Sequence, residues 1–97
     1  MRMARAHIVI QGLVQGVYFR ASTVEVARTN GVCGWVRNTP EGTVEAVLEG
    51  DEDSVKRVIE WCRTGPPMAR VDDVKVAWGK YRDEFDDFQA VTRHTTY

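Results

Sequence analysis

The segment from Gly12 to Arg20 constrains the fold most, because it must join an apolar run to a helix start signal within a short loop. Glycines at positions 12 and 16 allow the tight backbone turns that such a loop needs. Successive N–H groups that turn inward in such a loop form a concavity that binds anions. Arg20 ends the segment with a planar, permanently charged fork that can hold two oxygens of one phosphate. The segment therefore predicts a strand–loop–helix unit with a phosphate-binding loop.

Periodicity and turn chemistry predict the elements on either side of this loop. Ser22 and Glu25 have the spacing of a capping box, and Asn30-Gly31 is a helix stop, so we expect a helix over 22–30. A second helix is capped by Asp51, is ended by Gly65-Pro66-Pro67 and has its apolar side chains at helical spacing: Val55, Val58, Ile59 and Cys62. Alternating apolar and polar residues predict strands at 5–11, 34–39, 43–49, 71–78 and 88–92, with a tight turn at 40–42.

The order of these elements is βαββαβ with an extra C-terminal strand. With right-handed crossovers this order predicts one α+β domain over residues 1–97, a ferredoxin-like sandwich whose antiparallel sheet carries both helices on one face. In that topology the Gly12–Arg20 loop and the end of the strand at 34–39 lie at the same end of the sandwich. Arg20 and Asn38 should therefore meet there, although they belong to different elements.

Cys33 and Cys62 fall at opposite ends of this predicted sandwich. One strand, roughly 17–20 Å long, separates the two levels, whereas a disulfide needs Cα atoms within about 7 Å. We therefore expect two free thiols, and we expect Cys62, on the apolar stripe of its helix, to be the less accessible.

Charge and composition exclude several classes of partner. The formal net charge is -1 for 97 residues, so long-range attraction to polyanions is absent and any anion site must be local. Two cysteines are too few for a metal cluster or a disulfide scaffold. No apolar run approaches the roughly 18 residues of a membrane span, and the N-terminus has no signal-peptide core. We expect a cytoplasmic monomer that binds neither membranes nor nucleic acid.

Two long motifs resemble those of the acylphosphatase family. The family pattern G-x-V-Q-G-V-x-F-R is matched at every fixed position by residues 12–20, and G-W-V-R-N followed by G-x-V-E is matched by 34–38 and 42–45. The segment 65–71 resembles the family's G-P-x-x-A-x-V. The likeness extends from residue 5 to residue 93. It implies hydrolysis of the carboxyl–phosphate bond of acyl phosphates to a carboxylate and inorganic phosphate, with neither metal nor cofactor.

The resemblance also implies site residues. In the family, the matching loop binds the substrate phosphate through backbone N–H groups and the arginine, which here are the residues Gln15, Gly16, Val17, Tyr18, Phe19 and Arg20. The matching asparagine positions the attacking water, so Arg20 and Asn38 are the expected catalytic residues. Glu41 stands where an aspartate is frequent, which a turn tolerates. We assign no role to residues 94–97.

Alternative functions come from other classes. Ferredoxin-like sandwiches that bind RNA stack bases on aromatic side chains of the two central strands. Here the residues that those strands present include two carboxylates and no aromatic side chain, which argues against RNA binding. They are His7, Val9, Gln11, Thr43, Glu45, Val47 and Glu49. A phosphate-binding or regulatory module without turnover is not excluded by the sequence. A module of a larger carbamoyl-phosphate-processing enzyme is disfavoured by the length and by the lack of zinc-finger cysteines.

A few other side chains have structural expectations. We expect Phe19 in the core and His7 in a structural role at mid-strand, and a place at the mouth of the pocket is left open for Tyr18. Pro66, Pro67 and Met68 border the predicted site, where a role in shaping access and a plain loop role are equally open. The acidic residues within 83–87 should form a solvated loop.

Overall fold

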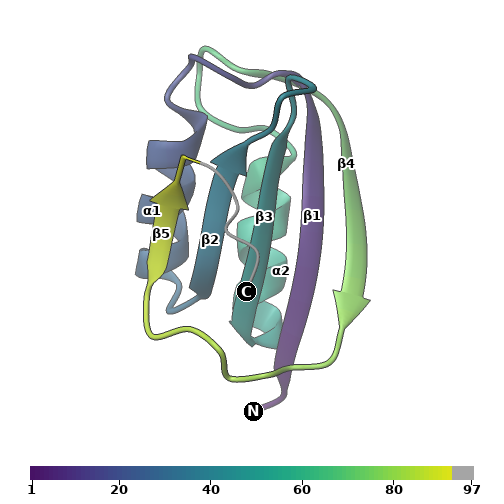
Figure 1. Cartoon of the computed structure of the whole chain (residues 1–97). Coiled ribbons are helices and arrows are strands. Elements are labelled where there is room, and N and C mark those ends of the chain that lie inside the picture. Colours follow the sequence, from purple (N-terminus) through teal and green to yellow (C-terminus); the bar gives the residue numbers. More distant parts are fainter. Residues whose placement is uncertain (93–97) are drawn as a thin grey trace.

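The computed structural model describes residues 1–92, which form two helices and a five-stranded sheet (Figure 1). Residues 94–97 lie outside the described part of the chain. The elements, in chain order, are β1 (Met3–Leu13), α1 (Phe19–Thr29), β2 (Cys33–Asn38), β3 (Val44–Asp51), α2 (Glu52–Cys62), β4 (Arg70–Gly79) and β5 (Phe88–Val91). Each predicted strand and helix is present, with ends that differ by at most three residues.

The sheet has the strand order β4-β1-β3-β2-β5, and both helices pack against one face of it (Figure 1). The first four strands pair antiparallel, as the ferredoxin-like prediction requires. The extra strand β5 pairs parallel with β2, with Gly34 opposite Phe88 and Arg37 opposite Val91. The fold class is therefore confirmed, and the sheet as a whole is mixed.

The core lies between the sheet and the two helices. It joins alternate residues of β1 and β3, such as Ile8, Ile10 and Leu48, to Val55 and Val58 of α2, all of them fully buried. The predicted apolar stripe of the second helix is confirmed, since its buried residues include Ile59 and Cys62 as well. Burial of each such aliphatic side chain stabilises the fold by about 1.5–3 kcal/mol relative to exposure.

The start of α1 differs from the prediction. The helix begins at Phe19 rather than at Ser22, and its N-cap residue, Tyr18, has a left-handed backbone and makes no side-chain cap. Ser22 already lies inside the helix, where its N–H donates to the carbonyl of Tyr18 at 3.0 Å. The capping-box interpretation was therefore wrong. Tertiary packing sets the start instead, because the Phe19 side chain is buried against the core.

The other helix ends follow the predicted residues more closely. Asn30 caps the end of α1, and Gly31 follows with φ 68°. Asp51 is the N-cap of α2 but makes no side-chain hydrogen bond there. The N–H of Glu52 instead donates to the carbonyl of Arg2 at 2.7 Å, so the chain before β1 supplies the cap.

Both cysteines are free thiols. Cys62, the last residue of α2, is buried, whereas Cys33, at the start of β2, is half-buried. Cys33 pairs with Glu49, close to the start of α2, whereas Cys62 is the last residue of that helix, which agrees with the predicted topology.

Candidate active site

The loop after β1 is shaped by residues with unusual backbone angles. At Gly12 the strand bulges against β4, and a Cβ added there would lie 2.1 Å from the carbonyl oxygen of Arg70. Only glycine fits so close to the neighbouring strand. Gly16 (φ 73°) and Tyr18 (φ 63°) both have positive φ, with Val17 between them. A backbone of alternating hand is the type that gathers N–H groups into an anion-binding concavity.

The predicted meeting of Arg20 and Asn38 is found in the structure. Both line a cavity of about 540 Å³ between the loop, the start of α1 and the ends of β2 and β5. The described residues that line it are Val14, Gly16, Tyr18, Phe19, Arg20, Ala21, Asn38, Ala90, Val91 and Thr92. The cavity therefore joins a cation from α1 to an amide from β2, across a loop that can present backbone N–H groups.

Gln15 has a side-chain contact that the motif did not predict. Its Nε2 donates to the carbonyl oxygens of Thr39 (2.8 Å) and Thr43 (2.9 Å). These two residues flank the turn between β2 and β3, where Thr39 and Thr43 also share a hydroxyl–hydroxyl hydrogen bond of 2.6 Å. The Gln15 amide thus braces the loop against the strand end that carries Asn38, while the contribution of its backbone N–H to phosphate binding stays a prediction.

The remaining loop residues divide into core and surface. Phe19 is 1% exposed, as predicted, and its ring lies 5.6 Å from that of Trp61, centroid to centroid. Val17 packs partly against the core and does not line the cavity. Tyr18 is 81% exposed and lines the cavity, which agrees with a place at its mouth.

One wall of the cavity was missed by sequence reasoning. Ala90, Val91 and Thr92 belong to β5 and the residue after it, and they lie beside the end of β2 because Arg37 pairs with Val91. The pattern predicts a strand at 88–92 but contains no signal for its partner. The parallel pairing of β5 with β2 is decided only by tertiary packing.

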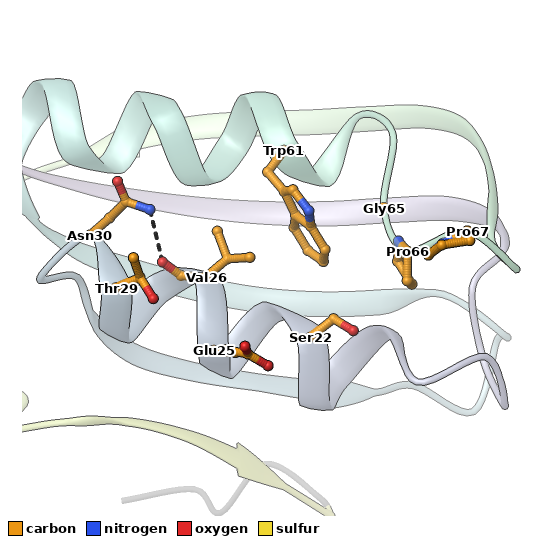
Figure 2. Close-up of a pocket in the computed structure, with 9 residues that line it drawn as sticks. All are labelled: Ser22, Glu25, Val26, Thr29, Asn30, Trp61, Gly65, Pro66 and Pro67. Atoms are coloured by element: carbon orange, nitrogen blue, oxygen red, sulfur yellow. Dashed lines mark hydrogen bonds between the residues drawn. The ribbon is translucent and has the colours of Figure 1, made fainter.

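The expectation that Pro66, Pro67 and Met68 border the site was wrong, because none of the three lines this cavity. Pro66 and Pro67 instead line a separate groove of about 410 Å³ between the two helices, with Trp61, Val26 and Ser22 (Figure 2). Figure 2 shows the Trp61 ring extending from α2 toward α1 in this groove. Trp61 lines the groove and Phe19 lines the cavity, and the two rings contact each other, so the groove and the cavity share this aromatic pair.

The charges in the cavity favour an anion. None of the carboxylates within residues 1–92 forms an ion pair with Arg20, so no described side chain competes with a bound anion for its guanidinium. The start of α1 adds the positive end of a helix dipole. Across residues 1–92, no group of three or more His, Cys, Asp or Glu side chains could hold a metal ion. No helix in that part of the chain is long and apolar enough to cross a membrane.

Comparison with known proteins adds independent information. The family model described as Acylphosphatase matches residues 6–90. An acylphosphatase of Pyrobaculum arsenaticum is 63% identical over 90 residues, which cover 92% of this chain and 95% of that protein.

Solved acylphosphatase structures resemble this chain as well. An acylphosphatase from Coxiella burnetii superposes with a TM-score of 0.87 at 35% identity, covering 92% of this chain and 93% of that one. The HypF protein of T. kodakarensis contains a similar region, with a TM-score of 0.79 at 29% identity, but the match covers 96% of this chain and only 12% of that one.

Proposed function

The chain belongs to the acylphosphatase family, and from this premise we propose that it hydrolyses the carboxyl–phosphate bond of acyl phosphates in the cavity between Arg20 and Asn38. The products are a carboxylate and inorganic phosphate. The observation that carries the site assignment is that these two residues, from α1 and β2, line one cavity together with the loop that precedes α1.

In this proposal the phosphoryl group of the substrate binds first to the loop. Backbone N–H groups of residues 15–20 and the Arg20 guanidinium hold its oxygens, each charge-assisted hydrogen bond contributing about 1.5–3 kcal/mol. Gln15 acts in a second way, since its side chain holds the loop against the turn after β2. The loop is thus ordered before substrate arrives, which lowers the entropy cost of binding.

Asn38 orients a water molecule in line with the bond that breaks. An amide is no base at neutral pH, so a phosphate oxygen of the substrate accepts the proton of that water. The leaving group is a carboxylate with a pKa of about 4, which departs without being protonated. The transition state of phosphoryl transfer is loose, so positioning and charge stabilisation supply most of the catalysis. No general acid and no metal ion is needed for this step.

We further propose that residues 1–97 act as a single domain and as a cytoplasmic monomer, on small acyl phosphates and without nucleic acid. A net charge of -1 supports the absence of nucleic acid from this proposal, since it gives no electrostatic footprint for a polyanion. The alternative is a module that binds phosphate without turning over a substrate. The Asn38 side of the cavity favours turnover, because phosphate binding alone needs only the loop and Arg20.

The test is an assay of the purified chain on benzoyl phosphate and carbamoyl phosphate, with and without EDTA. We expect hydrolysis of both that is unchanged by EDTA, with competitive inhibition by inorganic phosphate and by sulfate. Binding of phosphate without hydrolysis would support the non-catalytic alternative. Loss of activity in EDTA with recovery in Mg²⁺ would contradict the metal-free mechanism, and noncompetitive inhibition would place the site elsewhere.

A further inference from the structure

The segment of residues 80–87 connects the two opposite edges of the sheet. It leaves β4 at Gly79 and enters β5 at Phe88, and these strands are the first and last of the order β4-β1-β3-β2-β5. Figure 1 shows it running past the lower ends of the strands between those edges. The sequence predicts a solvated acidic loop, and the acidic side chains are indeed exposed, but the segment is held at several points.

Glu49 of β3 is the central anchor of this segment. Its side chain is 2% exposed, although the sequence predicts that it lies on the face of the sheet that no helix covers. The carboxylate accepts hydrogen bonds from the backbone N–H groups of Arg82 (2.7 Å) and Glu84 (3.0 Å). A third donor is the Arg5 guanidinium at 3.1 Å. Oε2 accepts the bonds from Arg82 and Arg5, and Oε1 accepts the bond from Glu84. A buried carboxylate with three donors fixes the chain that supplies them, because moving that chain away would leave the buried charge poorly paired.

Arg5 extends the anchor to the next part of the segment. Its Nη1 also lies 2.8 Å from a carboxylate oxygen of Glu84, and its guanidinium carbon is 5.6 Å from the centre of the Phe85 ring. Beyond Phe85, the carbonyl of Asp87 accepts from the N–H of Gly34 at 3.0 Å, directly before β5 begins. The anchored segment therefore delivers the chain to β5 in a defined position.

The position of β5 matters for the proposed reaction. Val91 pairs with Arg37, the residue before Asn38, and Ala90, Val91 and Thr92 line the cavity with Arg20 and Asn38. The strand spans only Phe88–Val91 and pairs with β2 alone, on the outer edge of the sheet. A short edge strand depends strongly on what precedes it, because its own ladder is small.

We propose that Glu49 is a positioning residue for acyl phosphate hydrolysis: by holding residues 80–87 it keeps β5 beside Asn38 and so keeps the attacking water in line. This inference rests on the proposed function. The inference distinguishes the two sides of the site. Within residues 1–92, the hydrogen bonds of Glu49 go to Arg5, Arg82 and Glu84 and none goes to the phosphate-binding loop before α1, whereas the strand that carries Asn38 pairs with β5.

The test compares Glu49→Gln with Glu45→Gln. An amide has one acceptor oxygen, so in Glu49→Gln at least one of the three donors faces another donor. Glu45 is the matched control, because it lies on the same strand and face and pairs with Arg37 (2.7 Å) and His7 (2.6 Å), not with residues 80–87. Three quantities are measured: kcat for benzoyl phosphate, the inhibition constant of inorganic phosphate, and amide hydrogen exchange of β5.

In Glu49→Gln we expect kcat to fall about tenfold, since a misplacement of ~1 Å can cost up to ~100-fold. The inhibition constant of phosphate should stay unchanged, and the amides of β5 should exchange faster. Glu45→Gln should alter none of the three. Should Glu49→Gln not fold, Arg5→Gln removes one donor and leaves both backbone hydrogen bonds, and we expect the same changes at smaller size.

Unchanged kcat and unchanged β5 exchange in Glu49→Gln would overturn the inference. So would a loss of phosphate affinity that matches the loss of kcat, because the whole site would then have collapsed, and so would equal losses in Glu45→Gln. A wild-type chain that hydrolyses no acyl phosphate would overturn the proposed function and this role with it. Faster β5 exchange in Glu49→Gln would still be seen in that case, which distinguishes the two failures.

Discussion

Arg20 and Asn38 come from separate elements, α1 and β2, so either can be replaced without removing the support of the other. Their proposed roles also differ in kind. Arg20 holds the phosphoryl group both in the substrate complex and in the transition state, whereas Asn38 orients the attacking water. Substitutions at the two positions should therefore separate binding from turnover.

Arg20→Lys should lose nearly all phosphate binding and turnover although it keeps the positive charge. An ammonium cannot make the two parallel hydrogen bonds of a guanidinium. Loss of one charge-assisted hydrogen bond, about 1.5–3 kcal/mol, corresponds to roughly 10- to 100-fold weaker binding. The inhibition constant of inorganic phosphate and kcat/KM for benzoyl phosphate measure this directly. Wild-type kinetics in this variant would remove Arg20 from the site.

Asn38→Ala should keep phosphate affinity and lose kcat, by about 100-fold if the water is no longer held in line. The short side chain opens space next to β5 but removes no group from the loop. Steady-state kinetics with phosphate as inhibitor separate the two effects. A variant with intact kcat and lost phosphate affinity would reverse the roles of Arg20 and Asn38.

The two thiols should differ in reactivity. Burial raises the pKa of Cys62 to about 12, and this outweighs the opposing effects of Arg63 and of a hydrogen bond with Thr23. Partial burial, helped by Asp87 and Asp86, also raises the pKa of Cys33. Because the thiolate is the reactive form, iodoacetamide at pH 8 should modify Cys33 slowly and Cys62 only after unfolding. Mass spectrometry of the native chain checks this order, and a Cys33–Cys62 disulfide in the native monomer would contradict the topology.

At the scale of elements, the turn after α2 and the start of α1 depend on each other. Gly65 has φ 71°, and a Cβ added there would lie 2.6 Å from Cε2 of Phe19. Phe19 in turn begins α1 and packs against Trp61 of α2. The end of one helix therefore fixes the start of the other, and this contact explains a helix start without a side-chain cap.

Gly65→Ala should lower the free energy of unfolding by about 1–3 kcal/mol, since it adds backbone strain and a clash with Phe19. Gly79→Ala is the matched control, because Gly79 has no positive φ and nothing within 4 Å of an added Cβ. Its effect should stay within about 0.5 kcal/mol. Urea unfolding of both variants is the measurement, and equal stabilities would show that the turn adapts to the added methyl group.

At the scale of the whole molecule, one buried and one partly buried carboxylate make stability depend on pH. Burial by itself would raise the pKa of Glu49, but the N–H groups of Glu84 and Arg82 and the Arg5 guanidinium lower it. Glu45 has a lowered pKa for a similar reason, since hydrogen bonds from His7 and Arg37 outweigh its burial. In both cases the unfolded chain binds a proton more readily than the folded one.

Stability should therefore be at its full value above the unfolded pKa of about 4.3 and should fall as the pH drops through the lower folded values. Urea midpoints between pH 3 and pH 6 test this, and Glu45→Gln should show a shallower decline than the wild-type chain. A wild-type midpoint that rises as the pH falls from 5 to 3 would contradict the assigned directions.

Much of this molecule follows from local sequence. The apolar spacing of Val55, Val58, Ile59 and Cys62 is sufficient to predict the buried side of α2. Asn30-Gly31 predicts the end of α1, and the order of strands and helices predicts the sheet that carries them. The motif at 12–20 predicts a phosphate-binding loop, and topology brings its Arg20 to Asn38. The inferences about elements and topology are confirmed, because periodicity, helix ends and turns depend on residues a few positions apart, whereas phosphate binding by the loop stays a prediction.

Only the tertiary structure decided the start of α1, the wall formed by β5 and the burial of Glu49. Phe19 begins α1 because its ring is buried between Gly65 and Trp61, which no pattern near Ser22 contains. β5 pairs parallel with β2 after its chain has passed β1, β3 and β2. The backbone donors of Glu49 lie 33 and 35 positions away in the sequence. Such contacts depend on how segments far apart in the sequence pack together. The periodicity of apolar residues within one segment carries no information about that packing.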